Sequence, residues 1–354
     1  MTLRNVAAPR TVVTVLVPAV VLVAGCGQQE SGAFTPRGSA AAEISWLFWV
    51  MVGLGAAVMV AVLWLLVRAA RTPGVDMTYR QRPGDPSRTE EADAEAEARR
   101  RRSNRLVIGG GIVLPVVILI PLTVLMLVVA GRISPFTSDD EPVEIHVIGH
   151  QYWWEVRYPG TEVVTANEIH IPAGTPVRLR LESADVIHSV WAPELAGKID
   201  MIPGETTYLD IDADEPGEYL GQCAEFCGLQ HARMRFLVIA SEPHEFDAWL
   251  VREAETARPA EETASQRGEQ VFAEAGCAAC HTVRGTEATG EQGPDLTHLA
   301  HRRTLAAGTL PNDREALIDW IIDPQGIKPG NLMPPTTLDD DDLSDLLEYL
   351  EGLE

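Results

Sequence analysis

The chain has 354 residues, 46% of them hydrophobic, and a formal net charge of −23. This length suffices for two or three domains. The charge is uneven, because the residues after Gly131 hold 15 Lys and Arg against 42 Asp and Glu. Nucleic acid is therefore excluded as a partner, since phosphate binding requires a basic surface. The five cysteines are odd in number, which argues against a plain disulfide framework.

Residues 1–25 predict an export signal. Arg4 and Arg10 precede an apolar run that ends in small residues, which is the pattern of a secretory signal peptide. The run ends in V-A-G-C at Cys26, and this motif resembles the lipobox of bacterial lipoproteins, in which the cysteine becomes a lipidated N-terminus. The alternatives are an ordinary signal peptide or an uncleaved anchor, with an incidental cysteine. Residues 26–43, rich in Gly, Ser and Ala, predict a polar spacer on the periplasmic side.

Two uncharged stretches predict a membrane hairpin. Residues 44–67 and 106–130 are each long enough to cross the hydrocarbon core as a helix. Between them, residues 68–105 hold ten arginines, and the excess of positive charge on inner loops places this segment in the cytoplasm. Both the N-terminus and everything after Gly131 are then outside, in agreement with the export signal.

Residues 142–240 predict an all-β domain. Alternating segments such as V-E-I-H-V-I-G-H and P-V-R-L-R-L-E are separated by turn signals such as P-A-G-T-P and I-P-G-E. Short alternating strands with Pro and Gly turns are typical of a β-sandwich or barrel. Residues 241–264 predict a linker that begins with a short amphipathic stretch, E-F-D-A-W-L-V, and becomes acidic and rich in Ala and Pro. The charge and the Ala and Pro content of residues 255–264 predict some mobility.

Residues 221–236, G-Q-C-A-E-F-C-G-L-Q-H-A-R-M-R-F, gather four soft metal ligands. Two thiolates, an imidazole and a thioether suit copper, whereas a thioether is a poor ligand for zinc. The upstream His188 supplies a further imidazole. Taken singly, a cysteine or methionine is more often a core residue, so the combination predicts the copper site. The soft ligands of this stretch are Cys223, Cys227, His231 and Met234.

Residues 265–354 predict a haem-bearing helical domain. The segment G-C-A-A-C-H has the C-x-x-C-H signature of c-type haem attachment. Cys277 and Cys280 are expected to form two thioether bonds to the haem, and His281 is expected to bind its iron.

Met333 in N-L-M-P-P is the expected second axial ligand of the haem iron, because it is the only methionine after the C-x-x-C-H segment. His298 and His301 are the competing candidates. The acidic C-terminal stretch predicts an amphipathic helix. It is expected to pack across the first helix of the domain through Leu346, Leu347 and Leu350.

The order of these features resembles subunit II of the haem–copper cytochrome c oxidases, in the variant with a cytochrome c fused at its C-terminus. Besides the copper stretch, three motifs carry the resemblance, at 149–158 (G-H-Q-Y-W-W-E-V-R-Y), 186–195 (V-I-H-S-V-W-A-P-E-L) and 197–204 (G-K-I-D-M-I-P-G). The resemblance implies a two-helix transmembrane hairpin, then an all-β cupredoxin-like Greek-key sandwich, then an all-α class I cytochrome c domain.

The resemblance also implies a mixed-valence dicopper centre, copper A. Two cysteines would bridge both copper ions, two histidines would each bind one, and a methionine and a main-chain carbonyl would complete the site. The Glu225 side chain would also reach a magnesium ion at the border with subunit I. The implied copper ligands are His188, Cys223, Glu225 (through its carbonyl), Cys227, His231 and Met234.

The implied function is electron transfer within a proton-translocating oxidase of the bacterial plasma membrane. Electrons from a cytochrome bc complex or a soluble cytochrome c would pass through haem c to copper A. The haem of subunit I would receive them next and reduce oxygen to water, with subunit III as a further partner. This chain would be a redox subunit without a catalytic pocket. The alternatives are a copper A nitric oxide reductase subunit and a membrane-tethered electron carrier without an oxidase partner.

Two departures from the family pattern bear on this function. Tyr152 stands where the family has a first Trp that admits electrons from soluble cytochromes, with Trp153 and Trp154 following. Donation from the tethered haem is therefore favoured over direct external docking. The start of the second span, N-R-L-V-I-G-G-G, lacks the glutamate found at the mouth of a proton channel in many relatives.

Overall fold

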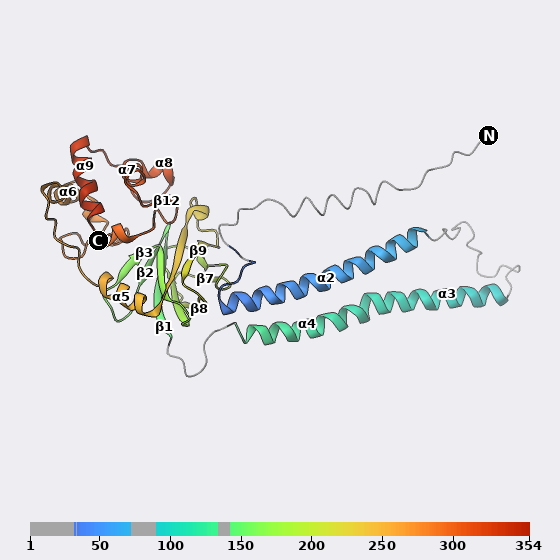
Figure 1. The fold of residues 1–354 in the computed structure, drawn as a ribbon. Helices are drawn as coiled ribbons and strands as arrows, with labels where there is room; N and C mark the ends of the chain where they lie inside the picture. Colours follow the sequence, from blue (N-terminus) through green and yellow to red (C-terminus); the bar gives the residue numbers. More distant parts are fainter. Residues whose placement is uncertain (1–31, 33, 72–89, 134–141) are drawn as a thin grey trace, which may run out of the picture.

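The computed structural model describes residues 32, 34–71, 90–133 and 142–354. The predicted export signal and Cys26 lie outside these residues. Two long helices extend from one side of a β-sandwich, and a helical domain packs on another side of the same sandwich (Figure 1). The predicted order of a two-helix hairpin, an all-β sandwich and a helical domain is confirmed.

The first long helix is α2 (Ser39–Arg71). The second is continuous from α3 (Glu90–Ile108) through the π-helical turn η2 (Gly109–Val113) into α4 (Leu114–Ala130). Both helices are long and apolar enough to cross a membrane. Most of their large apolar side chains are exposed, as expected of helices that face lipid or another membrane subunit.

The segment before α2 packs on the sandwich. The amide of Arg37 donates to the Glu194 carbonyl at 2.7 Å, and the amide of Ser39 donates to the Asp212 carboxylate at 3.0 Å. Ala40 is fully buried in the sandwich core. Ile133, which follows α4 in the chain, packs against the same core. The N-terminal end of α2 and the C-terminal end of α4 therefore both lie next to the sandwich.

The sandwich consists of two five-stranded sheets, with strand orders β3-β2-β1-β5-β8 and β4-β10-β9-β6-β7. Within them, β1 pairs with β5 and β4 pairs with β10 in parallel, and every other strand pair is antiparallel. The strands are β1 (Val143–His150), β2 (Trp153–Arg157), β3 (Val164–Ala166), β4 (Glu168–Pro172), β5 (Val177–Ser183), β6 (His188–Trp191), β7 (Ile199–Met201), β8 (Thr207–Ile211), β9 (Gly217–Cys223) and β10 (Arg235–Ser241).

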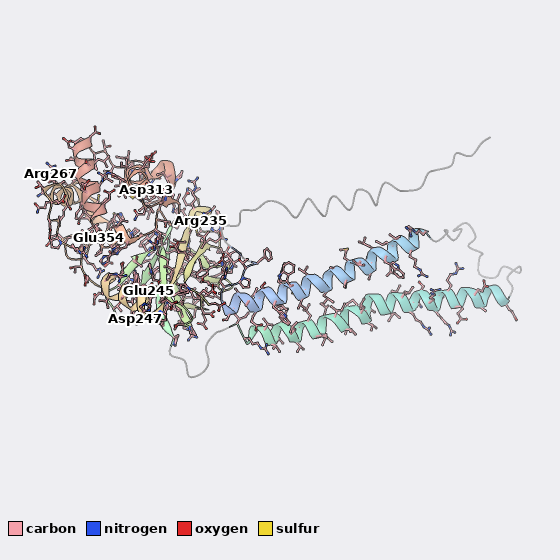
Figure 2. The ribbon with its side chains drawn as sticks, in the orientation of Figure 1. Arg235, Glu245, Asp247, Arg267, Asp313 and Glu354 are labelled. Atoms are coloured by element: carbon pink, nitrogen blue, oxygen red, sulfur yellow. The ribbon has the colours of Figure 1, made fainter. Side chains whose placement is uncertain are left out.

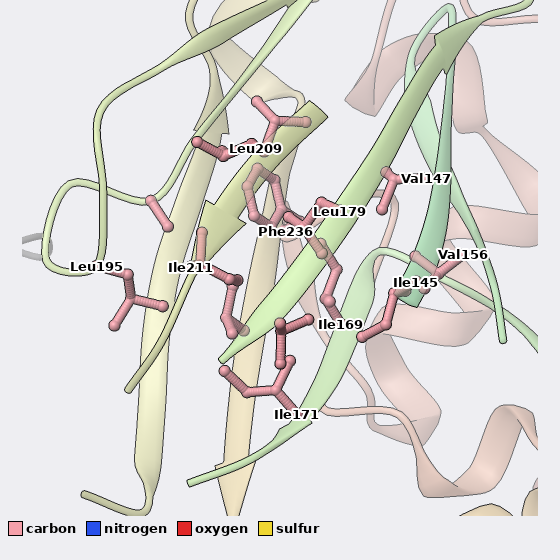
Figure 3. Packing of buried hydrophobic residues seen from close by; sticks show 14 of the residues in the cluster. Ile145, Val147, Val156, Ile169, Ile171, Leu179, Leu195, Leu209, Ile211 and Phe236 are labelled. Atoms are coloured by element: carbon pink, nitrogen blue, oxygen red, sulfur yellow. The ribbon is translucent and has the colours of Figure 1, made fainter. Parts of the chain in front are cut away.

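The alternating pattern in the sequence fixes which side chains enter the core. Ile145 and Val147 of β1 and Leu179 of β5 are buried, while the residues between them are at least partly exposed. Side chains from both sheets meet in this core, as Figure 3 shows for Leu179 of one sheet and Ile169 and Phe236 of the other. The sandwich is thus a packed scaffold, and its connecting loops are free to carry a site.

Helix α5 (Pro243–Glu253) follows β10 directly. Phe246 is buried in the sandwich core, and the Trp249 ring stacks on His170 at 4.0 Å. The first half of the segment expected to be a linker therefore belongs to the sandwich. Residues 254–262 connect α5 to the next helix.

The C-terminal domain is helical, with α6 (Thr263–Glu274) and α9 (Asp340–Glu351) packed together. Gly268 permits the close crossing, because a Cβ at this position would lie 2.0 Å from the Asp345 carbonyl oxygen. The predicted packing residues Leu346, Leu347 and Leu350 are buried. The remaining elements are η4 (Cys277–Ala279), η5 (Leu299–His301), β11 (Thr304–Leu305), β12 (Leu310–Pro311), α7 (Arg314–Ile322) and α8 (Pro324–Ile327).

Candidate metal and haem sites

The predicted copper ligands converge at one end of the sandwich. Residues 223–234, called the copper loop below, join β9 to β10 and include the short helix η3 (His231–Arg233). The sulfur atoms of Cys223 and Cys227 are 3.8 Å apart. The second sulfur lies 3.9 Å from Nδ1 of His231 and 3.8 Å from Sδ of Met234. Two thiols, an imidazole and a thioether from one loop thus surround a common centre.

His188, the predicted upstream ligand, enters the same cluster from β6. Its Nδ1 is 3.9 Å from the Cys223 sulfur, and its Nε2 is 2.8 Å from the Asp185 carboxylate. Burial is the largest single effect and lowers the pKa of His188, but the hydrogen bonds to Asp185 and Cys223 and the negative charge of both groups together raise the net pKa above its usual value. Since the carboxylate accepts from Nε2–H, the lone pair of Nδ1 is directed to the thiols, as in metal-bound histidines. Gly149 leaves room for this ring, because a Cβ there would lie 2.9 Å from it.

The two thiols are electrostatically coupled. The hydrogen bond with Cys227 lowers the pKa of Cys223 to about 3. The same hydrogen bond, together with burial, raises the pKa of Cys227, because its ionisation would place a second negative charge beside the first. Both sulfurs are at most 4% exposed. Two thiolates in this position require compensating positive charge, which bound metal cations would supply.

Glu225 contributes differently through its backbone and its side chain. Its carbonyl oxygen is 3.2 Å from the Cys223 sulfur, inside the cluster. Its carboxylate is 3.5 Å from the Lys198 ammonium, and Lys198 also contacts Asp200 at 3.1 Å. The metal-ligand groups found among the described residues do not include the Glu225 carboxylate, so the magnesium expectation receives no support.

The C-x-x-C-H segment forms a turn at the start of the C-terminal domain. Cys277 begins η4, and Cys280 follows it. Nδ1 of His281 is 2.8 Å from the Pro294 carbonyl, so Nδ1 carries the proton and Nε2 is the available ligand atom. Burial lowers the pKa of His281 and keeps the ring neutral. A neutral, oriented imidazole beside two free thiols fits a covalently attached haem.

Met333 lies in a loop held by side-chain amides. Its amide donates to Asn331 at 2.7 Å, and its carbonyl accepts from Gln325 at 2.9 Å. Its side chain packs against the core of the C-terminal domain. The competing candidates, His298 and His301, instead form a group with Glu253.

The three aromatic residues of the 149–158 motif have different environments. The Tyr152 hydroxyl accepts from the amide of Leu229 in the copper loop at 3.1 Å. Trp154 is fully buried and meets Phe236 edge to face, so it is a core residue. Trp153 is partly exposed and stacks on His150 at 4.4 Å.

The C-terminal domain docks directly on the copper loop. The Lys328 ammonium is 2% exposed and donates to the carbonyls of Tyr152 (3.0 Å) and Ala306 (2.9 Å). The Gln230 side chain donates to the Pro329 carbonyl at 2.7 Å. Arg235, labelled in Figure 2, donates its amide to the Ala307 carbonyl at 3.0 Å. The segment 327–333 thus connects the copper loop to Met333.

Sequence reasoning missed two residues that support the site. Gln151 donates its side-chain amide to the Cys227 carbonyl at 2.6 Å. Lys328 bridges the two domains, as described above. The only sequence signal for Lys328 was its rarity, because Lys198 and Lys328 are the only lysines in a chain rich in arginine.

Comparisons with known proteins agree with this architecture. The cytochrome c oxidase subunit II periplasmic domain matches residues 161–241, and the cytochrome c family matches residues 265–354. The periplasmic domain of subunit II of a cytochrome oxidase from Bradyrhizobium japonicum has a solved structure that is 28% identical. It covers 33% of this chain and 96% of its own length, with a TM-score of 0.32.

Two relatives extend the match over the chain. Cytochrome c oxidase subunit 2 of Bacillus subtilis is 32% identical over 68% of this chain and 72% of its own length. Cytochrome c oxidase subunit 2 of Alkalihalophilus pseudofirmus is 35% identical over 338 residues, which are 93% of each protein. That match spans the membrane helices, the sandwich and the C-terminal domain alike, and this chain therefore belongs to the cytochrome c oxidase subunit II family, with a cytochrome c domain at its C-terminus.

Proposed function

We propose that this chain is the electron-transfer subunit of a respiratory terminal oxidase. Electrons pass from a donor through covalent haem c to dinuclear copper A, and then to the haem of subunit I, where oxygen is reduced to water. The observation that carries this proposal is the buried convergence of two thiols, two imidazoles and a thioether around the copper loop. Family membership supports the oxidase assignment.

The copper ligands of this proposal are those of the cluster. Copper bound by these residues would supply one-electron redox chemistry. The protein's part is to hold the ligands in place before metal binds. Asp185 orients His188, Gln151 holds the Cys227 carbonyl, and both thiols are kept away from water. The ligand set is His188, Cys223, Cys227, His231, Met234 and the carbonyl of Glu225.

The haem ligands of this proposal are Cys277, Cys280, His281 and Met333. A methionine ligand gives a haem a higher reduction potential than a second histidine would. The packing of the structure supports Met333 as the axial ligand, because Met333 and Cys277 pack against the same core, whereas His298 and His301 form a separate group with Glu253.

The docked C-terminal domain supports internal donation. Tyr152 uses its hydroxyl to hold the copper loop and its carbonyl to hold Lys328. Its position at this boundary favours electron entry from the tethered haem, which a cytochrome bc complex or soluble cytochrome c would reduce. Trp153, which follows Tyr152 in the sequence, is partly exposed.

The proposal also covers the partners and the location of this chain. Subunits I and III are its partners, the α2 and α4 helices lie in the bacterial plasma membrane, and the sandwich and C-terminal domain are periplasmic. Proton translocation belongs to the complex as a whole. A magnesium ion between Glu225 and subunit I is proposed from the family resemblance alone, and among the described residues the Glu225 carboxylate pairs with Lys198.

A rapid-mixing experiment on the full-length chain, loaded with copper and haem, tests the route. After mixing with less than one equivalent of reductant, haem c should be reduced first and then partly reoxidised as the electron reaches the copper. In Cys227→Ser, haem c should be reduced normally and remain reduced. The His244→Ala variant, which changes an exposed histidine on α5, is the matched control. Normal reoxidation of haem c in Cys227→Ser would overturn the proposed route.

A further inference from the structure

A second group of metal-binding side chains lies away from the copper loop. Glu253 ends α5, and in the C-terminal domain His298 directly precedes η5 and His301 ends it. One ligand atom from each of the three residues lies within 4.8 Å of the others. The proposed electron route uses none of these residues. They come from the two sides of the junction between the sandwich and the C-terminal domain.

The spacing of the two histidines explains how they meet. They are three residues apart on a 3-10 turn, where side chains at positions i and i+3 lie above one another. Their rings are accordingly almost parallel, with an interplanar angle of 4° and centroids 5.8 Å apart. The turn therefore presents the imidazoles of His298 and His301 on the same side.

His298 has the protonation pattern of a metal ligand. The ring is 6% exposed, and its Nε2 lies 3.1 Å from the Glu255 carbonyl. A carbonyl only accepts, so Nε2 carries the proton and Nδ1 holds a lone pair. That Nδ1 is buried without a hydrogen-bond partner among the described residues. Buried polar atoms are rarely left unpaired, and a metal-bound histidine typically donates its other N–H to a carbonyl in this way.

Glu253 supplies negative charge at the same place. The residue is 4% exposed, and its carboxylate is 3.2 Å from Nδ1 of His301. His301 neutralises it only when protonated. A buried carboxylate needs a cation or several hydrogen bonds. The 3.2 Å separation is close to the roughly 3.3 Å expected between two ligand atoms around tetrahedral zinc.

We propose that Glu253, His298 and His301 bind a divalent first-row transition-metal ion such as Zn²⁺. Two imidazoles and a carboxylate are a ligand set that zinc accepts, and water occupies the fourth position. The His301 side chain is 42% exposed, so the ion enters from solvent. Because the carboxylate belongs to α5 and the imidazoles to the C-terminal domain, the bound ion fastens one to the other.

Zinc binding by the full-length chain tests this proposal. The protein, already loaded with copper and haem, is dialysed against Zn²⁺ alone, and zinc is counted against copper and iron. The wild type should retain one zinc ion per chain, and His301→Ala should bind it at least tenfold more weakly. His301 is exposed enough for this substitution to leave folding intact. His244→Ala, an exposed histidine on the same helix as Glu253, should bind zinc like the wild type.

X-ray absorption at the zinc edge gives a second readout. The wild type should show two imidazole ligands at about 2.0–2.1 Å, and Glu253→Gln should weaken binding while leaving the haem spectrum unchanged. The proposal is overturned if the wild type retains no zinc. It is also overturned if His301→Ala binds zinc as tightly as the wild type, or if His244→Ala loses it equally.

Discussion

Asp185 shows how a residue outside the ligand set prepares the copper site. It accepts from Nε2 of His188 at 2.8 Å and from the amide of Gln151 at 2.6 Å. The first contact fixes the tautomer of the histidine, and the second holds the turn that also reaches the Cys227 carbonyl. A residue outside the proposed ligand set therefore helps to fix the orientation of the ligand side chains.

Asp185→Asn should weaken copper binding about 10–100-fold, the usual cost of losing such a supporting contact. The substitution preserves size but removes the charge that orients the imidazole. Copper affinity measured by competition with a chelator checks this, with the exposed Asp214→Asn as control. Equal affinity in Asp185→Asn and the wild type would contradict the role given to Asp185.

Met333→Ala should leave the haem covalently attached and alter its axial ligation. The thioether bonds to Cys277 and Cys280 do not depend on the methionine, whereas the sulfur-to-iron charge-transfer band does. Absorption spectroscopy of the oxidised protein checks this. A wild-type spectrum without this band, and a haem spectrum that does not change in Met333→Ala, would move the axial ligand to His298 or His301.

The candidate copper ligands could be proposed from the sequence because four of them lie within one motif and are residue types that bind copper through their own side chains. Their supporting residues were not. Gln151 reaches the copper loop across 76 positions of the chain, and Lys328 reaches Tyr152 across 176. A side-chain amide or lysine in a loop has no special meaning until the fold brings its partner close.

At the scale of elements, periodicity predicted the strands and both long helices well. The period of two that predicted strands in β1 and β5 matches their alternating burial, because a one-residue slip would expose the core side chains. The packing of residues 34–40 against the sandwich was not predicted, since a Gly- and Ser-rich composition carries no period. The helical first half of 241–264 was visible only as a short amphipathic stretch.

Gly268→Ala should destabilise the C-terminal domain by about 1–3 kcal/mol or more, as overpacking does in other cores. The added Cβ would overlap the Asp345 carbonyl, which is backbone and cannot rotate away. Denaturant unfolding followed at the haem band measures this, with Gln270→Ala, on the exposed part of α6, as control. Equal stability of Gly268→Ala and the wild type would refute the close crossing.

At the scale of the whole molecule, the two redox domains form a single packed unit beside the membrane helices (Figure 1). The sequence predicted some mobility of the linker, and the described contacts hold the C-terminal domain against the copper loop. An acidic, Ala-rich connection is compatible with either arrangement, and the deciding contacts are made by loops far away in the sequence.

Lys328 makes this docking dependent on pH. Burial lowers its pKa to about 7, against an ordinary value of 10.5 when exposed. Below pH 7 the ammonium is charged in both the docked and the undocked state, and the full cost of burying it opposes docking. As pH rises from 7 to 10.5, the docked lysine releases its proton first. Docking should therefore strengthen over this range.

Lys328→Met should flatten this pH dependence. At pH 9 it should also weaken docking by about 1–3 kcal/mol, because the carbonyls of Tyr152 and Ala306 lose their donor. Cleavage of residues 254–262 by a glutamate-specific protease reports the undocked fraction, with Lys198→Met as control. Identical cleavage profiles for Lys328→Met and the wild type across pH would remove Lys328 from the interface.

Electron paramagnetic resonance of the full-length, copper-loaded chain tests the central claim most directly. One unpaired electron shared over two copper nuclei should give hyperfine structure from both, and Cys227→Ser should abolish it while the haem signal persists. A spectrum from a single copper ion, or none at full copper loading, would contradict the dinuclear centre and with it the electron relay.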